Sequence, residues 1–119
     1  MKASLGMATI ALSLFALTAA LLASPPNKTR HIQVVASRFS FEPSEITVKK
    51  GEPVTITFRS KDVTHGLVIE DLRIHREIKK GRPQDLTLVP GTTGTFEGRC
   101  AHFCGKGHAS MVFTVHVVE

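Results

Sequence analysis

The amino-acid sequence predicts a small all-β domain, a sandwich or a barrel, that follows an apolar N-terminal segment. Apolar and polar residues alternate with a period of two along most of the chain, as in strands that bury one face. Glycine and proline turn signals separate these short segments at regular spacing, which is typical of sandwiches and barrels. Beyond the N-terminal run, no stretch of the sequence has a helical period.

Residues 1–23 are an unbroken apolar run in which Lys2 is the only charge. Ser24-Pro25-Pro26 follows and cannot continue a helix. We interpret residues 1–23 as a hydrophobic helix, either a secretory signal peptide or an uncleaved membrane anchor. The run is just long enough to span a bilayer, which favours an anchor, whereas Thr18-Ala19-Ala20 offers a weak cleavage site.

Either interpretation predicts export, to the periplasm or the outer face of a bacterial inner membrane. Residues 24–30 are polar and proline-rich, which predicts a linker. Residues 31–119 then form the folded domain. At about 90 residues it is near the lower size limit for a self-sufficient core, so a bound metal would add to its stability.

Each expected strand carries Phe, Val, Ile, Leu or Ala on its buried face. In order, the expected strands cover residues 31–36, 39–41, 46–48, 54–58, 67–69, 72–78, 86–88, 95–99 and 111–118. Turn signals bound them at Glu42-Pro43, Lys50-Gly51, Lys79–Pro83 and Pro90-Gly91. The core must be built without Trp or Tyr, since the chain has neither, and it has seven Phe.

The formal net charge is +5, a modest basic excess. A basic domain can bind nucleic acid or an anionic membrane. No cluster of Lys and Arg is interleaved with aromatic residues, however, as a nucleic-acid surface requires. We therefore expect no nucleic-acid partner.

The segment from Cys100 to Met111, CAHFCGKGHASM, places two thiols, an imidazole and a thioether in one loop. His65 lies in another loop, between two expected strands. Thiolate, thioether and imidazole are together the ligand set that copper selects. Zinc binds Cys and His readily but has little use for Met. Gly105 and Gly107 allow the tight loop that brings ligands at its two ends together.

Other chemistry is open to these residues. Two Cys in an exported chain usually form a disulfide, although Cys100 and Cys104 would close a very short ring with little gain in loop entropy. Their spacing differs from that of the two-residue redox motif. The nearby imidazoles and thioether favour copper over a disulfide.

The remaining histidines are interpreted differently. His31, His75 and His116 lie at or beside strand positions, where solvated side chains are usual. His102 is ambiguous: its imidazole could be a spare ligand, but its place between the two thiols indicates that its backbone carbonyl faces the metal.

At these residues the chain resembles the CuA domain of cytochrome c oxidase subunit II, in its short, single-anchor bacterial form. It has a more distant likeness to the matching domain of nitrous oxide reductase. The family pattern is Cys-x-Glu-x-Cys-Gly-x-x-His-x-x-Met with an upstream His. Residues 100–111 match this pattern except at His102, and the upstream His is His65, within Val63-Thr64-His65-Gly66. Residues 41–46 and 94–96 are also similar, and the likeness runs from about Val34 to the C-terminus.

The resemblance implies a Greek-key cupredoxin β-sandwich with two copper ions bridged by Cys100 and Cys104. His65 and His108 would each bind one copper. Met111 would be a weak axial ligand on one ion and the His102 carbonyl on the other. Such a centre passes single electrons between a redox donor and acceptor, cytochrome c or an oxidase or reductase subunit.

Three departures from the family concern partners rather than copper. His102 replaces the usual Glu, whose carboxylate joins a magnesium site at the contact with the catalytic subunit in many members. The Trp/Tyr-rich entry patch for cytochrome c is absent, and the domain is basic where acidic docking residues are typical.

The favoured function is thus a dinuclear copper electron carrier, either free-standing or the electron-entry subunit of an oxidase-like complex. The alternative is a periplasmic copper chaperone or storage module without redox turnover. A mononuclear blue-copper protein needs one thiolate with two His, so the second Cys argues against it. No nucleophile–base pair or open substrate site is indicated, so an enzyme acting alone is not expected.

Overall fold

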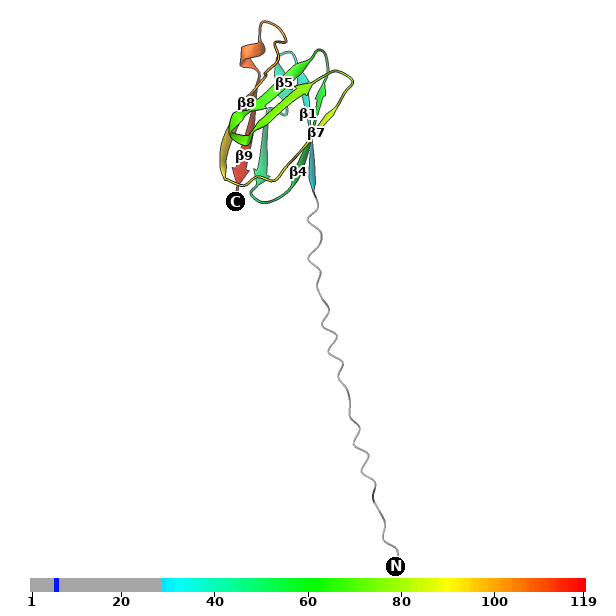
Figure 1. Cartoon of the computed structure of the whole chain (residues 1–119), viewed down its shortest axis with the longest axis vertical. Coiled ribbons are helices and arrows are strands. Elements are labelled where there is room, and N and C mark those ends of the chain that lie inside the picture. Colours follow the sequence, from blue (N-terminus) through cyan, green and yellow to red (C-terminus); the bar gives the residue numbers. More distant parts are fainter. Residues whose placement is uncertain (1–5, 7–28) are drawn as a thin grey trace, which may run out of the picture.

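The computed structural model describes Gly6 and residues 29–119 (Figure 1). Apart from Gly6, the predicted N-terminal helix, residues 1–23, and most of the linker lie outside the described residues. In the part described, no helix is long and apolar enough to cross a membrane. The described chain forms nine strands and two short 3-10 helices: β1 (Arg30–Ser37), β2 (Ser40–Glu42), β3 (Glu45–Lys49), β4 (Val54–Ser60), β5 (His65–Ile69), η1 (Glu70–Leu72), β6 (Ile74–Ile78), β7 (Gln84–Leu88), β8 (Gly94–Arg99), η2 (His108–Ser110) and β9 (Val112–Val118).

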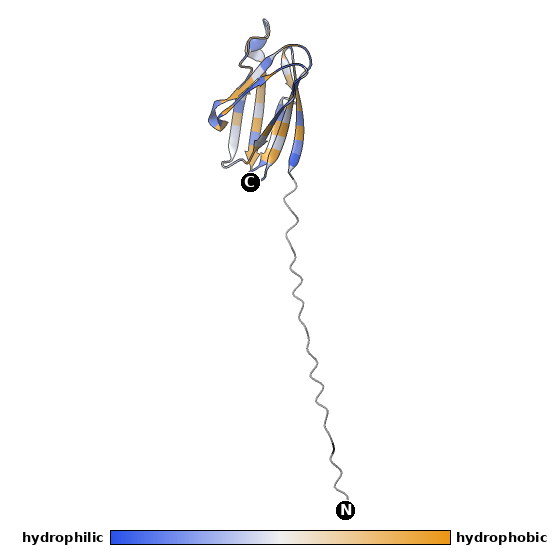
Figure 2. Ribbon diagram, turned by 45° about the vertical axis from the view of Figure 1, so that its right-hand side comes forward, coloured by the Kyte–Doolittle hydropathy of each residue, from blue (hydrophilic) through white to orange (hydrophobic). Residues whose placement is uncertain are grey.

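The strands form two sheets, which confirms the predicted all-β sandwich. The four-stranded sheet has the order β2-β1-β4-β7 and the five-stranded sheet the order β3-β9-β8-β5-β6. The β1–β4 and β3–β9 pairs are parallel and the other pairs antiparallel. Apolar and polar positions alternate along the strands (Figure 2), so each sheet turns one face inward.

Three phenylalanines join the two sheets. Phe41 on β2 and Phe58 on β4 belong to the four-stranded sheet, and Phe113 on β9 belongs to the other. All three are buried, and the Phe113 ring meets the other two edge-on, with centroids 5.9 Å and 6.0 Å away. Such edge-to-face pairs add to the stability that burial of the rings provides.

The observed strands follow the predicted ones closely, with two local corrections. Residue 72, predicted to begin a strand, lies in η1, and the left-handed conformation of Arg73 (φ 54°) separates η1 from β6. Phe39, predicted as a strand residue, lies in the turn between β1 and β2 with 39% of its surface exposed. The period of two is interrupted there because the chain reverses direction between the paired strands β1 and β2.

Candidate metal centre

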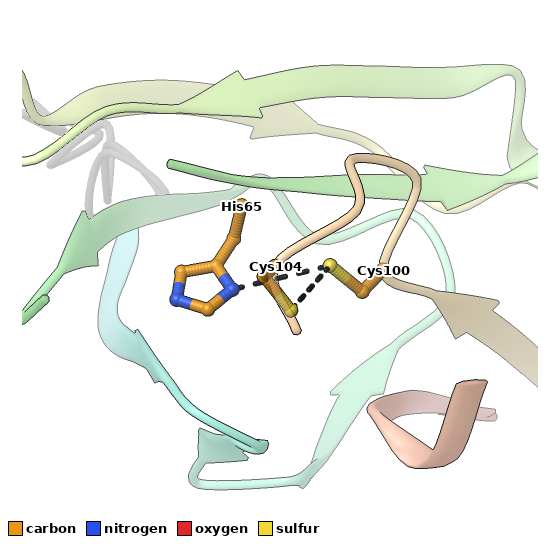
Figure 3. Close-up of side chains that lie close together, drawn as sticks. All are labelled: His65, Cys100 and Cys104. Carbon is orange, nitrogen blue, oxygen red and sulfur yellow. Dashed lines mark hydrogen bonds between the residues drawn. The ribbon is translucent and has the colours of Figure 1, made fainter. Parts of the chain in front are cut away.

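His65, Cys100 and Cys104 come together (Figure 3), and the loop with the two cysteines lies at one end of the sandwich (Figure 1). One potential ligand atom from each lies within 4.8 Å of the others, and all three residues are buried. His65 is the first residue of β5, and residues 61–66, which include the start of that strand, are here called the histidine loop. The two cysteines belong to residues 100–111 between β8 and β9, here called the cysteine loop. Strands β5 and β8 are neighbours, which brings the two loops side by side.

The two sulfurs are free thiols 3.8 Å apart. A disulfide has an S–S length of about 2.05 Å, so this structure does not contain that bond. Ligands that bind one ion tetrahedrally at about 2.0–2.3 Å lie roughly 3.3–3.8 Å from each other. The sulfur pair thus has the separation of two ligands that share a metal.

Four further donor atoms surround the sulfur pair, two on each side. Near Cys100 Sγ lie His65 Nδ1 at 4.0 Å and the His102 carbonyl oxygen at 3.2 Å. Near Cys104 Sγ lie His108 Nδ1 at 3.9 Å and Met111 Sδ at 3.4 Å. Each sulfur therefore has one imidazole nitrogen and one weaker donor beside it, so the six atoms form two similar halves.

The carbonyl of His102, rather than its imidazole, is the group beside Cys100. The thiol of Cys100 donates to that oxygen, while the His102 side chain is exposed. Met111 is fully buried just before β9, and His108 is half-buried in η2. The cluster thus includes all six residues singled out in the sequence, His102 through its backbone.

Asp62 orients the His65 ring. Its Oδ1 lies 2.7 Å from His65 Nε2, so an Nε2–H donates to the carboxylate and the Nδ1 lone pair faces the sulfurs. Burial raises the pKa of Asp62, but hydrogen bonds from the Arg38 amide, the His65 ring and the Val63 amide outweigh it and lower the pKa to about 2. The carboxylate is therefore ionised throughout the neutral range.

Burial, and then the hydrogen bond with Cys100, raise the pKa of Cys104 to about 11. The metal-free thiol is protonated at neutral pH as a result. A metal that binds the thiolate must displace this proton, so binding releases protons and strengthens as pH rises.

Glycines let the cysteine loop lie close to its surroundings. A Cβ on Gly66 would approach the His102 nitrogen to 3.1 Å, so the loops meet where residue 66 has no side chain. Gly105 has φ +140°, a conformation that other residues rarely adopt. A Cβ on Gly105 or Gly107 would come within 3.0 Å of the Phe39 ring, which covers this part of the loop.

Asp62 and Arg38 were not among the site residues predicted from the sequence. Asp62 had a local signal, because an acid three residues before a metal-binding His is well placed to orient its ring. Arg38 had none, since its contacts join segments far apart in the sequence.

The fold and this Cys/His cluster together define the class of protein to which the chain belongs. Residues 7–113 match the cupredoxin-like domain family, so the chain belongs to that family. Within the family, its relatives include cytochrome c oxidase subunits 2, and the cluster is compatible with a CuA-type copper site.

Two such relatives and one solved structure describe the likeness. Cytochrome c oxidase subunit 2 of Thermus thermophilus is 30% identical over 88 residues, 74% of this chain and 65% of the relative. A probable subunit 2 of Streptomyces avermitilis is 33% identical over 70 residues, 59% of this chain and 22% of the relative. The chain therefore spans less than two thirds of the length of these relatives.

The solved structure is the periplasmic domain of subunit II of cytochrome oxidase, CoxB, of Bradyrhizobium japonicum. Its TM-score is 0.69 at 19% identity, with 76% of this chain and 84% of that chain covered. This likeness supports the fold alone. Together with the two relatives, it confirms the resemblance predicted from the sequence motif.

Proposed function

We propose that this chain is an electron-transfer domain with a dinuclear CuA-type copper centre. The observation that carries the proposal is the sulfur pair at 3.8 Å, with an imidazole and a weaker donor beside each sulfur. Cys100 and Cys104 would bridge the ions, and His65 and His108 would each bind one. The weak donors would be Met111 Sδ and the His102 carbonyl. The bound copper pair supplies a one-electron couple.

Burial of the donor set supports electron transfer over copper delivery. His65 and Met111 are fully buried, and both thiols are nearly so. A rigid, water-poor site needs little rearrangement when an electron enters or leaves, whereas delivery favours exposed ligands. The chain also lacks a set of several Met for hand-over, since Met111 is its only Met beyond the apolar leader.

The relatives support a place for the domain in the cell. We infer a Greek-key cupredoxin held by residues 1–23 at the outer face of a bacterial inner membrane. Its donor or acceptor would be a cytochrome c or another subunit of an oxidase-like complex. The likeness to oxidase subunits 2 and to the CoxB periplasmic domain supports these proposals.

Copper stoichiometry tests the proposal. We expect two copper ions per purified chain, and loss of the pair in Cys100→Ser and Cys104→Ser. The matched control is His75→Gln, because His75 is exposed on β6 and should leave the stoichiometry at two. One copper per wild-type chain, or a bridged pair that survives in either serine variant, would be incompatible with a dinuclear centre.

A further inference from the structure

The turn between β1 and β2 contacts both loops that carry the metal ligands. It belongs to the four-stranded sheet, whereas the cysteine loop joins β8 and β9 of the five-stranded sheet and the histidine loop leads from β4 into β5. Between the two loops, the structure shows one backbone hydrogen bond, from Ala101 N–H to Gly66 O at 3.3 Å, in the part of the chain that it describes. That bond is long and therefore weak. A third element that contacts both loops can thus stabilise their arrangement.

Arg38 provides two such contacts. Its backbone N–H donates to Asp62 Oδ2 at 2.7 Å, and Asp62 holds the His65 ring through its other oxygen. Its side-chain Nε donates to the Cys104 carbonyl oxygen at 2.9 Å. A single residue thus links the histidine loop to the cysteine loop. The side-chain bond is charge-assisted, and such bonds are roughly twice as strong as neutral ones.

The neighbouring Phe39 adds a further contact with the cysteine loop. Its ring lies against Gly105 and Gly107, so close that a Cβ on Gly107 would meet ring carbon at 2.4 Å. Arg38 and Phe39 therefore both contact the cysteine loop, Arg38 at Cys104 and Phe39 at Gly105 and Gly107.

The charge of Arg38 has a second effect. Arginine stays protonated at all accessible pH values, so its guanidinium is a fixed positive charge beside Cys104. An oxidised copper pair carries one positive charge more than the reduced pair. A nearby cation repels that extra charge and favours the reduced form.

We propose that Arg38 is a positioning residue of the copper centre, which clasps the two ligand loops together and raises the reduction potential of the bound copper pair. The effect on the reduction potential rests on the proposed function. The clasp, the link that Arg38 makes between the two loops, is present in the metal-free chain as well. The two parts therefore have separate readouts.

Arg30 provides a matched control. It lies at the opposite end of β1, and its guanidinium also donates to a backbone carbonyl, that of Thr47 at 2.7 Å. Arg30→Gln removes the same charge and the same kind of bond away from the centre. Arg38→Gln is the test variant, and Arg38→Lys retains the charge without the guanidinium fork.

The first readout is amide hydrogen exchange of the metal-free protein. Arg38→Gln removes the charge-assisted side-chain bond to the Cys104 carbonyl and keeps the backbone bond to Asp62. Exchange should therefore become about tenfold faster or more in residues 100–111. Exchange elsewhere should be unchanged, and Arg30→Gln should leave both loops as in the wild type. Unchanged loops in Arg38→Gln, or a rise spread evenly over all strands, would overturn the clasp.

The second readout is the reduction potential of the copper-loaded protein, measured by spectroscopic redox titration. We expect a lower potential in Arg38→Gln, a potential near the wild type in Arg38→Lys, and no change in Arg30→Gln. An equal potential in Arg38→Gln and wild type would overturn the electrostatic part. If Arg38→Gln binds no copper, the potential of Arg38→Lys is compared instead: a wild-type potential supports the role of the charge, and a lowered one contradicts it. Failure of the wild type to bind two copper ions would count against the proposed function and leave the exchange test standing.

Discussion

Replacement of Asp62 by Asn tests how the centre orients its first histidine. The carboxylate accepts three hydrogen bonds of 2.7 Å, from His65 Nε2, the Val63 amide and the Arg38 amide. An asparagine keeps one oxygen for these donors and turns an NH2 group toward at least one of them. His65 is then free to rotate or to adopt the other tautomer, so its Nδ1 no longer points reliably at the sulfurs.

The size of the effect follows from this contact. Loss of a partner that orients a metal-binding histidine lowers metal affinity roughly 10- to 100-fold, which is about 1.4–2.7 kcal/mol. Competitive titration of copper against a chelator of known affinity measures the change. Asp85→Asn is the matched control, because Asp85 also accepts a 2.7 Å hydrogen bond, from the Thr57 hydroxyl, but on the exposed face of the β4–β7 pair. Equal affinity in Asp62→Asn and wild type, or an equal loss in Asp85→Asn, would refute the reasoning.

Three other predictions concern stability and the centre. The lowered pKa of Asp62, about 2 against 3.8, means that its ionised form stabilises the fold above pH 4 and that this contribution is lost as pH falls toward 2. After screening by solvent, this contribution amounts to about 1–2 kcal/mol. The free energy of unfolding in urea should therefore fall less between pH 5 and pH 2 in Asp62→Asn than in wild type. Equal falls in the two proteins would contradict this. Met111→Leu should retain copper and shift the reduction potential, because in the proposed centre Met111 would be a weak axial ligand, which tunes the potential rather than holding the metal. Complete loss of copper would exclude that role. Phe113→Ala should lower the free energy of unfolding by about 3–5 kcal/mol in urea denaturation, whereas Phe103→Ala, at a ring that is 74% exposed, should change it by about 0.5 kcal/mol or less; similar values would show that Phe113 does not join the sheets.

Local pattern was enough to predict most of the strands. Val54, Ile56 and Phe58 alternate with polar residues, and the structure buries all three on β4. The pattern misled at Phe39, since a turn residue can continue an alternation without belonging to a strand. The local pattern did not predict which strands pair, because pairs such as β1–β4 and β3–β9 join segments far apart in the sequence.

The sequence also predicted that Cys100, Cys104, His108 and Met111 lie close together, since all four belong to one loop. The residues that hold that loop were not predicted. Arg38 and Phe39 reach it from the other sheet, and nothing in their local sequence marks them. The role of the His102 carbonyl was predicted from its place between the thiols, and the structure puts that oxygen 3.2 Å from Cys100 Sγ.

Electron paramagnetic resonance of the copper-loaded protein tests the central claim most directly. A bridged pair built on Cys100 and Cys104 predicts one unpaired electron shared over two equivalent copper nuclei, with two coppers per chain. The signal of a single isolated copper ion would contradict the dinuclear centre and favour a mononuclear blue-copper site. Air-stable Cu(I) without any signal would contradict electron transfer and favour copper delivery.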